Sequence, residues 1–341
     1  MNTHHGTILY GGLSSLSTQL KKQEWENAQY TLLVDENTFQ HCLPHIVGRV
    51  EAFEQANFIE VPVGEEAKTL EVASQIWLTL LEDNADKQHV IINIGGGSIC
   101  DLGGFVASCY KRGIRYINIP TTLLAMVDAA IGGKTALDFG SVKNSIGQFY
   151  QPTLTVIEHS FLATLSPSET VNGVMEMVKT AIVTDPMLYA EIIATTSITK
   201  QQIQSVARNK SRIAKVDPYD QSVRHILNFG HTFGHAIEIV YKLPHGTSVG
   251  IGMLAALYLS TKKLSLPQTT YDTYYQWLTS NVSIPKFTLR DIEAMLALMH
   301  NDKKNQDSNI HCVLLQEVGA AVINIEVSDN EVRDALLFVA K

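Results

Sequence analysis

The sequence predicts an α/β domain built on a wound parallel sheet, followed by a mainly α-helical domain. Three observations lead to this fold class. Up to about residue 160, short apolar runs alternate with segments of helical periodicity. A run of three glycines at residues 95–97 closes one of the apolar runs. Beyond residue 160, long amphipathic segments follow one another. We therefore expect domains over residues 1–160 and 161–341, with ligands at the carboxyl ends of the strands.

The strands expected in the first domain are short, rich in β-branched residues and closed by Gly, Pro or Asp, as strands buried on both faces should be. A helix candidate, Thr69–Glu82, lies between two of them. This alternation of strand and helix is the pattern of a parallel sheet. The expected strands cover residues 31–36, 58–63, 89–97 and 116–120.

The second domain should open with a helix, because residues 166–169, Ser-Pro-Ser-Glu, have the capping pattern that starts one. Helical periodicity continues to about Leu298. Near the end of the chain two apolar runs are broken at Gly319, which predicts a small hairpin.

The composition indicates a globular protein and argues against large anionic partners. A chain of 341 residues can bury two cores, and 45% hydrophobic with 18% charged residues excludes disordered and fibrous proteins. A net charge of -8 argues against nucleic acid and anionic membranes, so we expect a small-molecule partner held in a local cationic pocket. The four cysteines lack metal or disulfide spacing. Without a secretory signal or an 18-residue apolar run, a cytoplasmic location is expected.

A glycine-rich turn is the first candidate site. An expected strand runs into Gly95, Gly96 and Gly97, and an apolar helical stretch begins around Ser98 and Asp101. Glycines let the backbone approach a pyrophosphate closely, and amides at a helix N-terminus attract anions. These features suit a dinucleotide. The pattern is not GxGxxG, so a tight turn without a ligand stays open as an alternative.

Three upstream residues are further candidates for that ligand. Asp35 ends an early strand, where a carboxylate can accept hydrogen bonds from ribose hydroxyls. Glu65 and Lys68 follow Gly64 at helical spacing. A solvated aspartate and an intrahelical ion pair are the alternative interpretations.

A group of cations is the second candidate site. Residues 111–144 carry five cations, among them Arg112, Lys134 and Lys143, within an acidic chain. Cations on loops at strand ends suit a phosphate or carboxylate substrate, although solvated surface cations are the alternative. Asp128 lies in an apolar run of the same stretch, where a carboxylate is rarely placed without a partner.

Histidines form the third candidate site. In NFGHTFGHAIE, His231 and His235 are four residues apart and share one helix face, with Glu238 a further turn along that face. His245 precedes a glycine at the expected start of another helix. Catalytic zinc takes three ligands from His, Glu and Asp. The spacing alone leaves a metal site and structural histidines equally open.

The chain resembles the 3-dehydroquinate synthases, within the sugar-phosphate cyclase group. The resemblance covers nearly the whole chain and rests on ordered blocks: GGGSICD, KRGIRYINIPTTLLAMVD, GGKTA, VKN, MEMVKT, KVDPYDQSVRHILNFGHTFGHAIE, PHG and NDKKN. It implies a Rossmann-like domain holding NAD, a helical domain, a homodimer, and one zinc ion, or cobalt or another divalent metal, in the cleft between the domains. The implied reaction belongs to the shikimate pathway of aromatic amino acid biosynthesis. It converts DAHP, a seven-carbon keto acid phosphate, to 3-dehydroquinate and phosphate by NAD-dependent oxidation, phosphate elimination, reduction and intramolecular aldol cyclisation.

The resemblance also implies roles for single residues. Glu176, His231 and His245 would be the zinc ligands, with His235 beside the substrate as a hydrogen-bonding or proton-transfer group. Further catalytic roles would fall to Lys134, Lys179, Asp128, Arg224 and Asn228. The implied substrate-binding residues are Arg112, Asp128, Lys134, Lys143, Asn144, Lys179, Lys210, Arg224, Asn228, His235 and one or both of Lys303 and Lys304. Those implied for NAD are Asp35, Glu65, Lys68, Gly95, Gly96, Gly97, Ser98, Asp101, Thr121 and Thr122.

Four departures from the family pattern involve five positions. Thr247 stands where the family usually has a Glu, two residues after the second implied zinc histidine. A carboxylate beside the ligand, and with it a candidate partner for that ligand, is therefore missing. Asp220 replaces a Glu, Cys100 replaces a Gly, and Ala129-Ala130 replaces two serines.

Three other functions stay open at this point. A paralogous cyclase would use the same scaffold for a different sugar phosphate. An NAD- and metal-dependent polyol or iron-type alcohol dehydrogenase would release NADH, but the LGGF that follows GGGSICD is not its expected sequence. An inactive homologue would only bind nucleotide.

Overall fold

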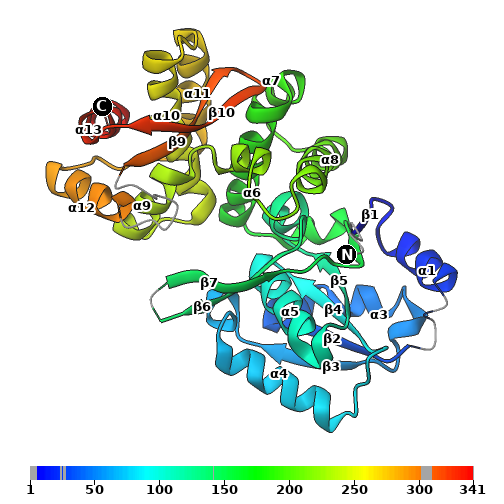
Figure 1. Cartoon of the computed structure of the whole chain (residues 1–341). Helices are drawn as coiled ribbons and strands as arrows, with labels where there is room; N and C mark the ends of the chain where they lie inside the picture. Colours follow the sequence, from blue (N-terminus) through cyan, green and yellow to red (C-terminus); the bar gives the residue numbers. More distant parts are fainter. Residues whose placement is uncertain (1–5, 24, 26–27, 141, 301–308, 341) are drawn as a thin grey trace. The chain divides into compact units, whose positions relative to one another are not determined.

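The structure is a computed structural model that describes residues 6–23, 25, 28–140, 142–300 and 309–340 (Figure 1). The chain forms two compact units, residues 1–170 and 171–341. We expected the division at residue 160, and the structure divides the chain inside helix α6 (Pro167–Thr184). None of the described helices has the length and apolar composition that a membrane span requires.

The first unit is built on a six-stranded sheet of parallel strands, which confirms the predicted α/β class. The strand order is β1-β8-β5-β4-β2-β3. All four predicted strands are present, whereas β1 and β8 were not predicted, because three residues are too few to show a periodic pattern. The strands are β1 (Thr7–Leu9), β2 (Tyr30–Asp35), β3 (Asn57–Val61), β4 (Val90–Gly95), β5 (Arg115–Pro120) and β8 (Leu154–Val156).

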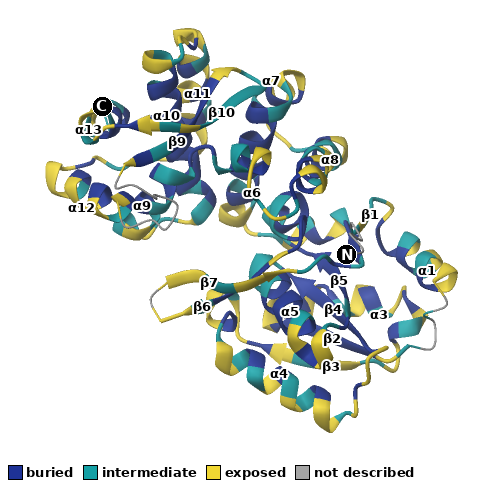
Figure 2. Cartoon of the chain, viewed as in Figure 1, coloured by how far each residue is buried: buried dark blue, intermediate teal, exposed yellow. Residues whose placement is uncertain are grey.

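Helices bury the sheet, and every residue of β2 and β4 is buried (Figure 2). The predicted helix over Thr69–Glu82 is confirmed as α4 (Leu70–Glu82), with the Thr69 hydroxyl capping its first turn. Ile76 of α4 meets Leu33 and Ile91 of the sheet in one core cluster, and each such buried side chain stabilises the fold by roughly 1.5–3 kcal/mol. The other helices of this unit are α1 (Gly12–Lys22), α2 (Glu36–His41), α3 (Leu43–Val47) and α5 (Gly97–Cys109).

The cation-rich residues after β5 form a helical turn and a hairpin, rather than the loop that we expected. A single π-helical turn, η4 (Ala125–Ala129), holds Asp128. An antiparallel hairpin of β6 (Lys134–Phe139) and β7 (Val142–Phe149) follows and reaches out past the sheet in Figure 1. We did not predict the hairpin, because the glycines and charged residues in this stretch obscure an alternating pattern.

The second unit is mainly helical, as predicted. The hairpin expected around Gly319 is confirmed, and this glycine has a φ of 90°, a left-handed conformation that side chains disfavour. The hairpin strands are β9 (Ile310–Glu317) and β10 (Ala320–Val327). Besides α6, the helices are α7 (Pro186–Ala194), α8 (Lys200–Val216), α9 (His231–Tyr241), α10 (His245–Lys263), α11 (Gln268–Asn281), α12 (Leu289–His300) and α13 (Asp329–Val339).

Candidate metal centre and nucleotide site

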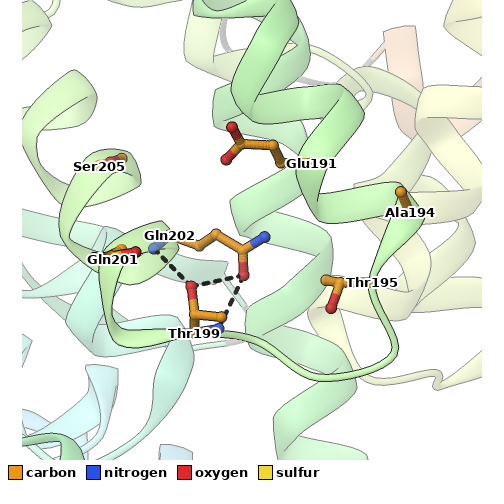
Figure 3. Close-up of a pocket in the computed structure, with 7 residues that line it drawn as sticks. All are labelled: Glu191, Ala194, Thr195, Thr199, Gln201, Gln202 and Ser205. Carbon is orange, nitrogen blue, oxygen red and sulfur yellow. Dashed lines mark hydrogen bonds between the residues drawn. The ribbon is translucent and has the colours of Figure 1, made fainter.

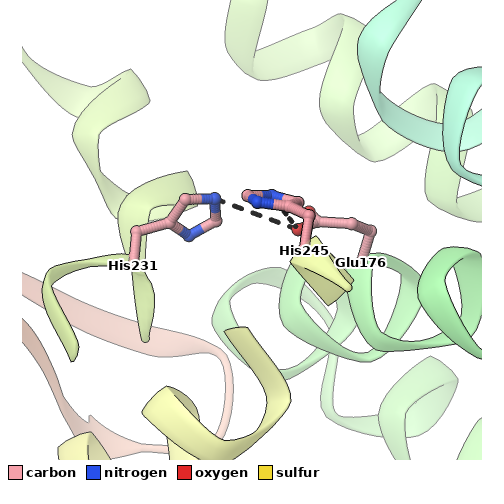
Figure 4. A group of neighbouring side chains, drawn as sticks. All are labelled: Glu176, His231 and His245. Carbon is pink, nitrogen blue, oxygen red and sulfur yellow. Dashed lines mark ion pairs between the residues drawn. The ribbon is translucent and has the colours of Figure 1, made fainter. Parts of the chain in front are cut away.

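Three potential metal ligands converge in the second unit (Figure 4). Glu176 lies on α6, while His231 and His245 are the first residues of α9 and α10. One ligand atom from each residue lies within 4.8 Å of the others. Oε1 of Glu176 is 3.9 Å from Nε2 of His231 and 3.5 Å from Nε2 of His245. Ligands of a tetrahedral zinc ion stand roughly 3.4 Å apart, so these distances are near those that one ion requires.

Close helix packing brings the three residues together. A Cβ atom at Gly246 would lie 2.3 Å from the carbonyl oxygen of Asn172, so the start of α10 can touch α6 because residue 246 has no side chain. A Cβ atom at Gly252 would lie 2.2 Å from the carbonyl oxygen of Gly230, the residue before α9. Glycine therefore permits the approach of α10 to both neighbouring segments.

The charge of Glu176 is set by its neighbours. The side chain is 1% exposed, and Lys179, one turn along α6, forms an ion pair with its Oε2. Burial alone would raise the pKa of this carboxyl, but the positive charges of Lys179 and His245 outweigh burial and hold the pKa well below its usual range. Glu176 is therefore an anion at neutral pH, with Oε1 turned toward the two imidazoles (Figure 4).

A second carboxylate contacts the other side of His245. Nδ1 of His245 is 2.9 Å from Oε2 of Glu238, which lies on α9. Burial would lower the pKa of His245, but its contacts with Glu176 and Glu238 raise that pKa to about 9. We had placed Glu238 on the helix face of the histidines without giving it a role. In the sequence, only the i, i+3 spacing of Glu238 from His235 indicated that this carboxylate lies near the histidines. Its contact with His245 depends on the packing of α9 against α10.

His235 takes a different position from His231. Its ring centre is 5.2 Å from that of His231 and 5.9 Å from that of His245. Among the described residues, the group whose ligand atoms converge is Glu176, His231 and His245, without His235. His235 therefore lies beside the group of three rather than in it.

Other predicted substrate residues of this unit lie in and before a short 3-10 helix, η6 (Val223–Asn228). Arg224 is buried, Asn228 is half-buried, and Lys210 is buried on α8. The carboxylate of Asp217 accepts hydrogen bonds from the backbone amides of residues 221, 222 and 224. Burial would raise the pKa of Asp217, but these hydrogen bonds lower it to about 2. Asp217 thus holds the segment that carries Arg224.

The predicted nucleotide residues lie at the carboxyl ends of neighbouring strands in the first unit. The chain leaves β2 for β3 on one side and continues from β4 to β5 on the other, so the strand order reverses between β2 and β4. Asp35 ends β2, glycines 95–97 end β4 and start α5, and Thr121 follows β5. In open α/β sheets, ligands bind in the crevice at this reversal. Oδ1 of Asp35 also accepts a hydrogen bond from the amide of Thr38, as the cap of α2.

A buried lysine joins the predicted nucleotide and substrate residues. Lys68 is 3% exposed, and its ammonium group donates hydrogen bonds to Asp101, at 3.0 Å, and to Asn144. Glu65 lies 3.8 Å from the same ammonium group and accepts a hydrogen bond from Ser98. We predicted Asn144 for the substrate and the other four residues for NAD. The structure brings all five together in one network.

The remaining predicted cations are exposed. Arg112, Lys134 and Lys143 are exposed in the first unit. Lys303 and Lys304 lie outside the described residues. A recess between α7 and α8 has a polar lining in which Glu191 is the charged side chain, and Thr199 with Gln202 forms the capping box of α8 there (Figure 3). This recess shares no residue with the predicted sites.

Comparison with known proteins assigns the family. The profile of the 3-dehydroquinate synthase N-terminal domain matches residues 58–172, and that of the C-terminal domain matches residues 173–305. A 3-dehydroquinate synthase of Parabacteroides distasonis is 36% identical over 319 residues, 90% of each chain. This chain belongs to the 3-dehydroquinate synthase family. The resemblance that we found in the sequence is therefore confirmed.

Solved structures agree with the dehydroquinate synthase fold. A 2-epi-5-epi-valiolone synthase from Streptomyces hygroscopicus, described with NAD+ and Zn2+ bound, superposes with a TM-score of 0.85 at 24% identity, covering 98% of this chain and 96% of that one. A 2-deoxy-scyllo-inosose synthase, described in complex with carbaglucose-6-phosphate, NAD+ and Co2+, has a TM-score of 0.81 at 21% identity, covering 97% and 96%. At these identities the likeness establishes the fold.

Proposed function

We propose that this chain is a 3-dehydroquinate synthase that converts DAHP to 3-dehydroquinate and phosphate, using NAD and one divalent metal, zinc or cobalt. The observation that carries the proposal is the convergence of Glu176, His231 and His245 beside Lys179 in a chain of this family. The bound NAD+, metal ions and sugar-phosphate analogue described for the two solved relatives support it.

The donor set fits a divalent ion. Among the described residues, Oε1 of Glu176 is buried without a hydrogen-bond partner and faces two imidazole nitrogens, so a divalent cation between the three groups would satisfy this oxygen. One carboxylate and two histidines are a common zinc donor set that leaves a position for a substrate oxygen. Lys179 contacts the other oxygen of Glu176, so it does not compete for this position.

The turn after β4 fits a dinucleotide. A Cβ atom at Gly96 would lie 3.2 Å from the side chain of Thr122, so glycine keeps this surface open next to the first turn of α5. The amides of that turn can bind a pyrophosphate. When bound, NAD would accept and return a hydride, and the metal would polarise the substrate hydroxyl.

The chain's own residues would bind and orient the substrate. Lys179 and Arg224 are buried cations that can hold phosphate or carboxylate in place, and a cation taken out of water binds an anion more strongly than a solvated one does. The ring centre of His235 is 5.2 Å from that of His231 and 5.9 Å from that of His245, so this side chain can hold or move a proton of a substrate bound at the metal. The other substrate, catalytic and NAD roles named above remain part of this proposal.

The proposal extends to assembly and location. We propose a homodimer in the cytoplasm, with no nucleic-acid or membrane partner. The net charge of -8 supports the absence of these anionic partners, because they bind basic surfaces.

Turnover with DAHP tests the proposed function. Purified protein should release phosphate from DAHP in the presence of zinc and a catalytic amount of NAD, without net accumulation of NADH, and NMR should identify 3-dehydroquinate. Glu176→Gln should abolish release, whereas Glu191→Gln, on the recess of α7, should not change it.

The same assay separates the alternatives. Phosphate release with a different carbocyclic product would indicate a paralogous cyclase. NADH accumulating from a simple polyol would indicate a dehydrogenase. Binding of NAD without either signal would contradict the proposal that this chain is an enzyme, and would indicate an inactive homologue.

A further inference from the structure

We propose that Glu238 is the positioning residue of His245: it fixes the tautomer and the orientation of this imidazole. The inference deepens the proposed function, since it rests on His245 being a metal ligand. It concerns how the metal position is built, and metal binding can be measured without turnover.

The hydrogen bond determines which nitrogen carries the proton. A carboxylate is only an acceptor, so the 2.9 Å contact between Oε2 of Glu238 and Nδ1 of His245 requires the proton on Nδ1. A metal ion binds the neutral form of the imidazole, which then presents its lone pair at Nε2. Nε2 is the nitrogen that lies 3.5 Å from Oε1 of Glu176. The bond to Glu238 therefore turns the correct nitrogen toward the other ligands.

His245 is the first residue of α10, and its side chain is 37% exposed, whereas the side chain of Glu238 is 15% exposed. A half-exposed ring at a helix start can adopt several rotamers, and ordering it costs entropy. One hydrogen bond to a better-buried carboxylate restricts that choice before a metal arrives.

Glu238 also links two ligands through one rigid element. It lies on α9, the helix whose first residue is His231, and Lys242 turns the chain out of α9 in a left-handed conformation with a φ of 52°. Glu238 and His245 are seven residues apart and face each other across this turn. Helix α9 thus supplies one ligand directly and orients the other.

The threonine at position 247 is consistent with this arrangement. The neutral imidazole that binds a metal ion has a single N–H, and Glu238 already accepts it, so a second carboxylate would find no donor on this ring. Thr247 is half-buried, and its backbone amide faces Oδ1 of Asn172 at 3.4 Å. The loss of a carboxylate at position 247 therefore leaves the hydrogen bond of His245 intact.

Metal affinity of the metal-free full-length protein tests the inference. Zn2+ and Co2+ affinity would be measured by chelator competition, and the Co2+ absorption spectrum would report coordination. Glu238→Ala should weaken binding by roughly 10- to 100-fold and alter the spectrum, as loss of such partners does in other metal sites. Glu238→Gln should bind within about threefold of wild type, because its amide oxygen still accepts from Nδ1. Glu191→Ala and Thr247→Glu serve as controls that should leave the affinity unchanged.

The outcomes distinguish this inference from the proposed function. Wild-type protein that binds neither ion would remove the metal centre and this inference with it. Wild-type binding together with unchanged binding by Glu238→Ala would overturn the inference alone. A loss in Glu238→Gln as large as in Glu238→Ala would assign the effect to charge rather than orientation and would also overturn it. Thermal unfolding of the metal-free variants, expected to match wild type within a few degrees, separates either effect from misfolding.

Discussion

Lys68 should stabilise the first unit through a buried ion pair with Asp101. Lys68→Met removes the only charge of this side chain and keeps most of its apolar volume, while Asp101→Asn removes the charge of its partner. If the 3.0 Å contact stabilises the fold, each single variant should lose stability and the double variant should lose less than the sum.

The magnitude follows from distance and burial. At 3.0 Å, with an effective dielectric constant of about 20, two unit charges attract by roughly 5 kcal/mol. Desolvation of Lys68, 3% exposed, offsets much of this attraction, and solvent weakens it further at Asp101, 19% exposed. We therefore expect a coupling free energy of about 2 kcal/mol. Burial would lower the pKa of Lys68, but Asp101 and Glu65 raise it above its usual value, so the lysine charge is retained through neutral pH and the stabilisation is lost only above pH ~10.4.

Urea unfolding of the four proteins measures the coupling. The free energies of unfolding would be compared at pH 7 and pH 9, where the coupling should be equal. Lys87→Met changes an exposed lysine of the same unit and should shift stability by less than about 0.5 kcal/mol. A coupling below about 0.5 kcal/mol at both pH values would refute the reasoning and leave Lys68 as a cation available to a ligand.

Three further predictions concern the second unit. Removing the metal with a chelator should abolish phosphate release and lower the melting temperature of the protein, and adding zinc should restore both. Full activity of the metal-free protein would contradict the proposed catalytic role of the metal. Because the pKa of Asp217 is lowered to about 2, Asp217→Asn should cost about 2 kcal/mol of unfolding free energy at pH 7. The stability difference between wild type and Asp217→Asn, measured by urea unfolding, should shrink as pH falls from 4 toward 2. A difference that does not change with pH would count against a lowered pKa of Asp217. Gly246→Ala would place a Cβ atom 2.3 Å from the carbonyl oxygen of Asn172, so zinc affinity should fall at least tenfold, and unchanged affinity would show that α6 and α10 can separate without harm.

Much of the secondary structure and the chemistry available could be predicted from the amino-acid sequence. Compact, β-branched apolar runs between helical segments predicted the strands β2 to β5, and the broken runs around Gly319 predicted the last hairpin, because such patterns are local properties of the chain. The resemblance selected Glu176, His231 and His245 from many acidic and histidine residues. The short strands β1 and β8 and the hairpin of β6 and β7 escaped prediction, because their local patterns are too short or too polar.

Which side chains meet depends on the packing of the helices and strands. His231 and His235 share a helix face, so their spacing could not choose between them, whereas the approach of α10 to α9 and α6 places His231 with Glu176 and His245. The contact of Lys68 with Asn144 spans 76 positions. Such pairings depend on how helices pack and strands are ordered, and a single chain's periodicity carries no information about distances between elements.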